Sequence, residues 1–217
     1  MKLSRVLITG CGGMLGSAIY PYFRDYFETV LATDKDVCEP WLQPLDVRDA
    51  EGTKAIFASF KPDLVLHLAA ETDLEYCETH QDVAYSTNTT ATRQLAELCE
   101  ENGATLVYIS TAGTFDGEKK TPYTEEDEPK PIMVYGQSKY DGENHVRDIC
   151  SRFYVVRAGW MVGGGQKKDH KFVSKIIEQI VENKPVIYAV SDKWGAPTYT
   201  HDFALNLFKL LDSEHYG

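Results

Sequence analysis

Short apolar runs alternate along the chain with longer segments in which apolar residues recur every three or four positions. The apolar runs predict buried strands at residues 6–8, 29–33, 64–68, 106–109, 154–156 and 186–190. The periodic segments predict helices at about 14–27, 49–60, 82–102, 135–151, 172–183 and 202–211. Strands that alternate with helices form βαβ units, so we expect an α/β fold. Its architecture would be a Rossmann-like, doubly wound parallel sheet with helices on both faces.

Composition narrows the class of protein. The 217 residues fit one large domain, or one domain with a small lobe. A net charge of −11 argues against nucleic acid as a partner, since phosphates need Lys and Arg surfaces. The sequence has no secretory signal and no apolar run near the ~20 residues of a membrane span, so we expect a cytoplasmic protein without a membrane partner. The five cysteines contain no CxxC pair, and we expect reduced thiols and no metal site.

A glycine-rich turn lies between the first predicted strand and the first predicted helix. Its glycines fall at Gly10, Gly13 and Gly16, a spacing that allows a tight turn and close approach of a pyrophosphate. The N–H groups at the start of the helix, at Met14 and Leu15, would face the bound anion. The context predicts dinucleotide binding, and the alternative is a plain structural turn.

Asp34 closes the second predicted strand, 18 residues after Gly16. A carboxylate there can accept hydrogen bonds from the adenosine ribose hydroxyls and would repel a 2′-phosphate, which favours NAD over NADP. The adjacent Lys35 could soften that preference. Asp46 and Val47 fall where a loop could flank the adenine. The alternative for Asp34 is a solvated loop acid.

Three side chains suggest proton transfer. Tyr135 and Lys139 form a YxxxK pair, which places both on one face of a helix. A nearby ammonium would stabilise a phenolate whose ordinary pKa of ~10 is too high for acid–base work near neutrality. Thr111 directly follows a strand, at the sheet edge where a hydroxyl could bond a substrate carbonyl. Each feature alone is common in solvated helices or strand caps, but their order after a dinucleotide turn points to an oxidoreductase.

Together these motifs resemble those of extended short-chain dehydrogenases/reductases, and more narrowly the dTDP-4-dehydrorhamnose reductase family. The resemblance is carried by residues 9–16, 62–70, 108–111, 115–117, 122–125, 134–139, 156–160 and 195–199. It implies an NAD(P)H-dependent reductase of a nucleotide-diphosphate 4-keto-6-deoxysugar, with dTDP-4-dehydrorhamnose as the first candidate. It also implies a homodimer, the common state of extended members.

The resemblance implies a role for each catalytic residue. Tyr135 would protonate the C4 carbonyl, and Thr111 would orient that carbonyl. Lys139 would bind the nicotinamide ribose and lower the pKa of Tyr135.

The resemblance also implies binding residues. The cofactor's path would be lined by Leu68, Ala69 and Ala70. Thr72 would reach toward the nicotinamide and the substrate, and Trp160 would flank the sugar. The glycine- and lysine-rich stretch 163–171, which ends at Lys171, could receive the substrate diphosphate, or it could be an exposed, mobile loop.

The chain departs from the family pattern in two places. After the threonine, the family's acidic and aromatic side chains are replaced by Ala112 and Gly113, and its valine by Thr114, which alters the wall of the substrate pocket. The chain also stops at Gly217, short of the family's usual length. We therefore expect an NAD(P)-binding domain at 1–156. Residues 157–217 would then be a mixed segment holding late sheet elements and part of a small, incomplete C-terminal substrate lobe.

Two other functions remain open. The same fold serves NAD-dependent sugar-nucleotide epimerases and dehydratases, which would retain a tightly bound NAD. It also serves a non-catalytic NAD(P)-binding regulatory subunit, the beta subunit of methionine adenosyltransferase, whose nucleotide-binding domain acts mainly as a partner surface.

Overall fold

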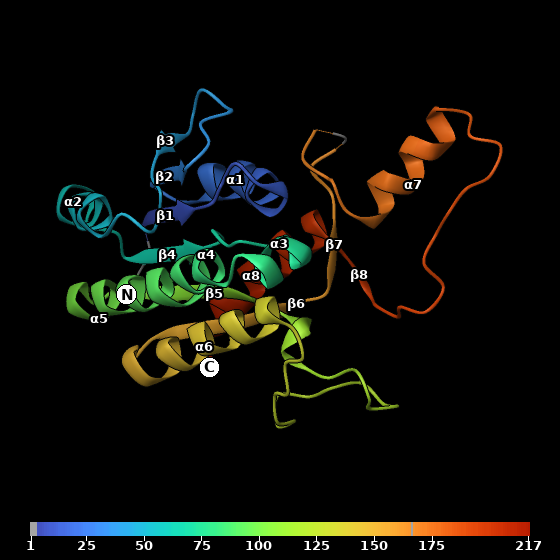
Figure 1. The fold of residues 1–217 in the computed structure, drawn as a ribbon. Helices are drawn as coiled ribbons and strands as arrows, with labels where there is room; N and C mark the ends of the chain where they lie inside the picture. The colour runs from blue at the N-terminus through green and yellow to red at the C-terminus, as the bar shows by residue number, and fades with distance from the viewer. Residues whose placement is uncertain (1–3, 166) are drawn as a thin grey trace.

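The computed structural model describes residues 4–165 and 167–217, and its centre is one parallel sheet (Figure 1). The sheet has six strands in the order β3-β2-β1-β4-β5-β6. These strands are β1 (Arg5–Thr9), β2 (Thr29–Asp34), β3 (Gln43–Pro44), β4 (Leu64–His67), β5 (Thr105–Thr111) and β6 (Phe153–Ala158). The order reverses between β1 and β4, so the predicted doubly wound parallel sheet is confirmed, with its ligand crevice expected at that switch point.

Helices cover both faces of the sheet. The α-helices of the described residues are α1 (Met14–Tyr26), α2 (Ala50–Phe60), α3 (Leu74–Thr79), α4 (Gln81–Tyr85), α5 (Ala91–Asn102), α6 (Val134–Ile149), α7 (Phe172–Val181) and α8 (Thr200–Ser213), of which α7 stands away from the sheet. Alternate strand residues point to opposite faces. On one face Ile8 packs with α1 and α8, and on the other Leu7 packs with α2 and α5. Both faces are therefore buried, as the continuous apolar strands predict.

The long helix predicted at 82–102 is interrupted. Between α4 and α5 the chain forms a π-helical turn, η1 (Ser86–Thr90). At its centre, the Asn88 carbonyl accepts hydrogen bonds from the hydroxyls of Thr92 and Tyr108. The interruption therefore lies where a helix carbonyl also accepts hydrogen bonds from two side chains.

The chain returns to the sheet at its end. Helix α8 packs on α1 through an aromatic cluster in which the Phe23 and Phe208 rings lie 4.6 Å apart. The backbone of Gly217 then bonds to the edge strand β6, at Phe153 O and Val155 N, both at 2.9 Å. Residues beyond β6 are thus divided between the sheet layer and a separate lobe.

The lobe consists of β7 (Trp160–Val162), β8 (Pro197–Tyr199), α7 and the coil between α7 and β8. Figure 1 shows α7 and this coil standing away from the sheet and its helices. The predicted strand at 186–190 is wrong, because this stretch is exposed coil. Its Tyr188 backbone N–H and carbonyl bond to the Gln179 side chain instead of to a neighbouring strand. A strand needs such a neighbour, and none lies beside this apolar run in the described residues.

Across residues 4–165 and 167–217, no helix combines the length and apolar character that crossing a bilayer requires.

Candidate functional site

The β1–α1 turn packs directly against the end of β4. Gly10 has a φ of +68°, and a Cβ there would lie 2.4 Å from the Ala69 nitrogen. A Cβ on Gly16 would lie 2.4 Å from the Cys11 Cα, so the helix start also touches the turn. Both positions therefore require glycine. The turn lies against the segment after β4, where the strand order of the sheet reverses.

The N-terminus of α1 suits an anion. Gly13 precedes the helix without a side-chain cap, and the first turn, which begins with Met14 and Leu15, holds no acidic residue in the part of the chain described. The N–H groups of this turn therefore have no competing side-chain acceptor there, and the helix dipole adds partial positive charge. The start of α1 therefore keeps free N–H groups at the place where the sequence predicts a pyrophosphate.

Asp34 reaches from the end of β2 to this same turn. Its carboxylate accepts hydrogen bonds from the backbone N–H groups of Gly12, at 2.8 Å, and Asp36, at 3.0 Å. The neighbouring Cys11 is buried, and burial together with the Asp34 charge raises the pKa of its thiol to about 12. Cys11 is therefore a neutral packing residue beside the Asp34 side chain.

Asp46 and Val47 follow β3, whose Pro44 pairs in register with Asp34. The Asp46 carboxylate forms an ion pair with Arg48 at 2.5 Å, and that hydrogen-bonded contact lowers the pKa of Asp46. Val47 is buried in the core below. The two residues thus lie beside Asp34, with the Asp46 side chain already engaged by Arg48.

The residues after β4 lead from the glycine turn to Lys171, which precedes α7. Leu68, Ala69 and Ala70 follow the strand, and Ala69 contacts the glycine turn. Two residues on, the Thr72 carbonyl accepts a hydrogen bond from the Lys171 ammonium at 3.1 Å. The structure therefore brings together two of the residues assigned to the substrate.

Thr111 and Tyr135 come together at the carboxyl edge of the sheet. Thr111 ends β5, and α6 begins so close by that a Cβ on Gly136 would lie 2.2 Å from the Gly113 carbonyl. A hydrogen bond from Thr111 lowers the pKa of Tyr135, but desolvation outweighs it and leaves that pKa at about 12. The phenol is therefore protonated at neutral pH, the state that a general acid requires.

Lys139 is buried one turn further along α6. Its ammonium lies 4.0 Å from the centroid of the Tyr108 ring, and burial lowers its pKa to about 7. That Lys139 lowers the pKa of Tyr135 stays a prediction. The hydroxyl of Thr111 acts on Tyr135, while the ammonium of Lys139 lies over the face of Tyr108.

Sequence reasoning missed Asn88, which joins three parts of the site. Its amide donates to the Glu71 carbonyl and to the Ser138 hydroxyl, both at 3.0 Å, and accepts from the Glu71 N–H at 2.8 Å. Asn88 thereby ties the segment after β4 to α6. The sequence feature that could have pointed to Asn88 is the run of polar residues at 86–90, which interrupts the apolar periodicity of the predicted helix.

Trp160 belongs to the lobe. It begins β7 and is half exposed, with its ring 6.3 Å from the ring of Phe172. A Cβ on Gly195 would lie 2.4 Å from the Trp160 ring, so the coil before β8 packs flat against the indole. The coil thus covers part of the indole, while 43% of Trp160 stays exposed.

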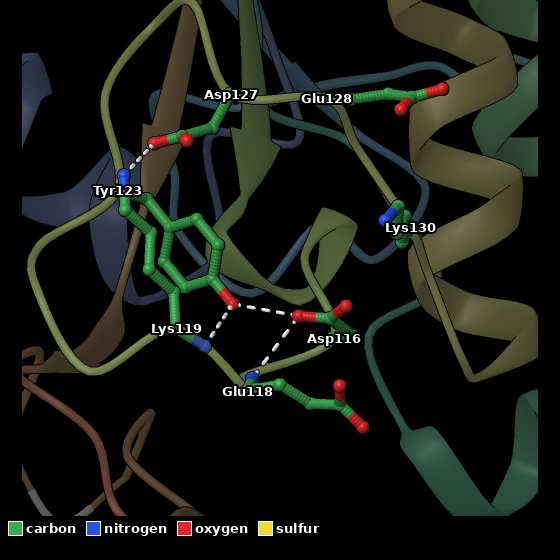
Figure 2. A pocket seen from close by; sticks show the side chains of 7 residues that line it. All are labelled: Asp116, Glu118, Lys119, Tyr123, Asp127, Glu128 and Lys130. Carbon is green, nitrogen blue, oxygen red and sulfur yellow. Dashed lines mark hydrogen bonds and ion pairs between the residues drawn. The ribbon is translucent and has the colours of Figure 1, made fainter.

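A surface cavity of about 350 Å³ lies away from these residues, in the loop after β5. Figure 2 shows its lining of Asp116, Glu118, Lys119, Tyr123, Asp127, Glu128 and Lys130. Tyr123 donates to Asp116 at 2.7 Å, and Lys119 pairs with Asp127 at 2.5 Å. None of the predicted site residues lines this cavity. Among the described residues, no group of three or more His, Cys, Asp or Glu side chains is arranged to hold a metal ion.

Comparison with known proteins gives a family match and several relatives. Residues 4–216 match the family described as RmlD substrate binding domain. The dTDP-4-dehydrorhamnose reductase of Aggregatibacter actinomycetemcomitans is 30% identical over 97% of this chain and 68% of its own length. Methionine adenosyltransferase 2 subunit beta of Danio rerio is 32% identical over 92% of this chain and 61% of its own length.

Solved structures agree with the sequence match. The dTDP-4-dehydrorhamnose reductase of Bacillus anthracis, solved in complex with NADP, aligns with a TM-score of 0.88 at 31% identity. The alignment covers 100% of this chain and 73% of that one. This chain therefore spans between about three fifths and three quarters of the length of these three proteins.

Proposed function

Because this chain belongs to the RmlD substrate binding domain family, we propose that it is an NAD(P)H-dependent reductase of a nucleotide-diphosphate 4-keto-6-deoxysugar. The first candidate substrate is dTDP-4-dehydrorhamnose, after the relatives that carry that name. The observation that carries the proposal is the meeting of Thr111 and Tyr135 at the carboxyl edge of the sheet, the same edge at which the glycine turn follows β1.

The crevice fits a dinucleotide. A Cβ at Gly10 or Gly16 would collide with backbone, and the start of α1 offers N–H groups without a side-chain cap in the described chain. We assign the pyrophosphate to this turn, with Gly13, Met14 and Leu15 around it. The adenosine ribose belongs at Asp34, and the adenine beside Asp46 and Val47. Because a carboxylate repels a 2′-phosphate, NAD is the preferred cofactor and NADP the second.

In the proposed reaction, the bound cofactor supplies a hydride to C4 of the sugar. Tyr135 donates the proton that completes the alcohol, and Thr111 holds the carbonyl oxygen by a hydrogen bond. Lys139 binds the nicotinamide ribose, near the path lined by Leu68, Ala69 and Ala70. The raised pKa of Tyr135 suits this direction, since the phenol carries its proton before the reaction.

The substrate is assigned to the edge between the sheet and the lobe. Thr72 and Lys171 lie in contact there, and a diphosphate would engage the Lys171 ammonium. Trp160 would stack on the sugar with the part of the indole that stays exposed. Because Ala112, Gly113 and Thr114 leave a wall of small side chains after Thr111, we expect a substrate range that differs from that of the family's usual members.

The proposed organisation follows the same division. Residues 1–156 would bind the cofactor, and 157–217 would combine late sheet elements with part of the substrate lobe. A cytoplasmic location and a homodimer, the common arrangement of extended members, complete the proposal.

The decisive experiment is NADH oxidation with dTDP-4-dehydro-L-rhamnose by this chain and its Tyr135→Phe variant. We expect turnover to fall by ~10²–10⁴-fold, because the variant has no proton to donate, while NADH affinity stays within about twofold. Tyr140→Phe, on the same helix, is the matched control and should keep full turnover. Full turnover by Tyr135→Phe would remove the acid assignment.

A second candidate function is favoured by the Danio rerio relative, a subunit named for its complex with methionine adenosyltransferase. In that case the chain would bind NAD(P) and a partner enzyme without catalysis. The same assay separates the two: NADH binding without turnover on any 4-keto-sugar, together with a stable complex with a methionine adenosyltransferase catalytic chain, would favour the subunit.

A further inference from the structure

The Lys139 ammonium rests on an aromatic face. Lys139 is 2% exposed, and its Nζ lies 4.0 Å from the centroid of the Tyr108 ring. In residues 4–165 and 167–217, neither a hydrogen bond nor an ion pair joins this ammonium to a protein oxygen. A buried cation without such a partner is costly, so the ring is the main attractive contact on the protein side.

The nearest carboxylate on the same helix is committed elsewhere. Glu143, one turn beyond Lys139, is fully buried and accepts two hydrogen bonds from Arg157, at 2.9 and 2.7 Å. A third, at 3.0 Å, comes from Arg147. Two guanidinium groups thus surround this carboxylate, and its charge supports the Lys139 cation only from a distance.

The Tyr108 ring is held rigidly. Its hydroxyl donates to the backbone carbonyls of Asn88 and Lys139, each at 3.2 Å. The hydroxyl fits only because residue 142 is glycine, since a Cβ there would lie 2.5 Å from the oxygen. The position of the ring is therefore set by β5, η1 and α6 together.

The imidazole on the other side of the ring is uncharged. His67 stacks on Tyr108 with centroids 5.7 Å apart, and its two nitrogens bond to the hydroxyls of Thr9 and Thr92. Complete burial lowers the pKa of His67 to about 3. A neutral imidazole does not compete with the ammonium for the negative face of the ring.

We propose that Tyr108 is a positioning residue whose ring face holds the Lys139 ammonium in place of a carboxylate. The ring face attracts the cation without supplying an oxygen acceptor, so the N–H groups that point away from the ring stay free for the hydroxyls of the nicotinamide ribose. A carboxylate partner would occupy one or two of those donors. The use of these donors rests on the proposed function, whereas the contact between ring and ammonium does not.

The direct test follows the ionisation of Lys139 in the free protein. Lysine labelled with ¹³C at Cε reports the protonation of each side chain by NMR, and Lys139→Met identifies the relevant signal. The groups that can influence this titration are Tyr135 and Glu143 on α6, Tyr108 on β5, His67 on β4 and Arg157 on β6. Only position 108 is changed, so the other four stay constant.

The variants separate the ring from the hydroxyl. Tyr108→Phe keeps the ring, and its Lys139 midpoint should stay within about 0.3 pH units of the parent. Tyr108→Leu removes the ring, and the midpoint should fall by ~0.5–1.5 units because the cation loses its attraction. An unchanged or higher midpoint in Tyr108→Leu would overturn the proposal.

A second series covers the case in which Tyr108→Leu does not fold. Singly and triply ring-fluorinated phenylalanines, incorporated only at position 108, keep the shape of the ring while weakening its negative face. The Lys139 midpoint should fall stepwise with fluorination, and NADH affinity at pH 7 should fall with it. If the Lys139 midpoint is the same in all the fluorinated variants, the proposed role of the ring is overturned. A graded series in a protein that never oxidises NADH with any 4-keto-sugar leaves the contact established and removes only the proposed reductase.

Discussion

The sheet half of the molecule and the lobe built on β7, α7 and β8 bury their apolar residues to very different degrees. In the sheet, Ile8, Leu66 and Leu106 are fully buried. In the lobe, Ile180 is 55% exposed and Trp194 is 93% exposed. The other large apolar side chains exposed on α7 and the coil after it are Phe172, Val173, Ile177, Val181, Val186, Ile187, Tyr188 and Val190.

The difference teaches that an apolar pattern fixes local structure only where a partner surface is present. The amphipathic pattern of α7 forms the predicted helix, yet its apolar face remains exposed. The apolar run at 186–190 forms no strand at all, whereas the equally apolar run of β4 lies between β1 and β5. Most of the stability of the protein should therefore reside in the sheet half.

The largest expected effect compares two glycines with positive φ. Gly10→Ala places a Cβ 2.4 Å from backbone in the sheet half, and we expect a loss of about 3–5 kcal/mol in the free energy of unfolding. Gly165→Ala, in the loop between β7 and α7, has a φ of +66° and no neighbour within 4 Å in the described residues, so the loss should be about 1 kcal/mol or less. Urea denaturation measures both, and equal losses would contradict the comparison.

A second pair compares the same residue type in the two regions. Ile8→Ala opens a cavity in a closed core and should cost about 3–4 kcal/mol of unfolding free energy. Ile180→Ala removes a side chain that is already half exposed, and its cost should stay near 0.5 kcal/mol. Thermal or urea unfolding of both variants provides the measurement. A large loss from Ile180→Ala would mean that the face of α7 is covered in solution.

The third prediction concerns the charge buried in the sheet half. Burial lowers the pKa of Lys139 from 10.5 to about 7 in the folded protein. Between pH 7 and pH 10.5, Lys139 is therefore protonated in the unfolded chain and mostly neutral in the folded protein. The cost of burying the cation is therefore complete below pH 7 and fades as the pH rises toward 10.5. Lys139→Met should raise stability by about 2 kcal/mol at pH 6.5, with a smaller gain at pH 9. Lys54→Met, at an exposed position, is the control, and a gain independent of pH would refute the explanation.

The smallest effect concerns cofactor choice at the edge of the sheet. Asp34→Asn keeps an acceptor for the Gly12 N–H but removes the charge beside the proposed ribose site. We expect NADH to bind about tenfold more weakly and NADPH more tightly than in the parent, because the repulsion of the 2′-phosphate is gone. Fluorescence titration with both cofactors measures this, with the exposed Asp36→Asn as control. An unchanged ratio of the two affinities would remove Asp34 from the ribose site.

The sequence by itself determined the parallel sheet and the positions of the chemical groups along it. Strands that alternate with helices pack as a parallel sheet with helices on both faces. The carboxyl ends of its strands then lie at one edge of the sheet. The glycine turn, Asp34, Thr111 and Tyr135 could therefore be assigned before any coordinates, since each follows or ends a strand, or begins a helix, at that edge.

Only the tertiary structure decided what each of these groups contacts. The Lys139 ammonium lies on the Tyr108 ring while Glu143 is held by two arginines, and Asn88 joins the segment after β4 to α6 across 50 residues of sequence. The coil at 186–190 likewise depends on the absence of a neighbouring strand among the described residues. Local patterns encode backbone preference and side-chain type, but contact energies depend on burial and on partners that are distant in sequence. These become defined only when the chain is folded.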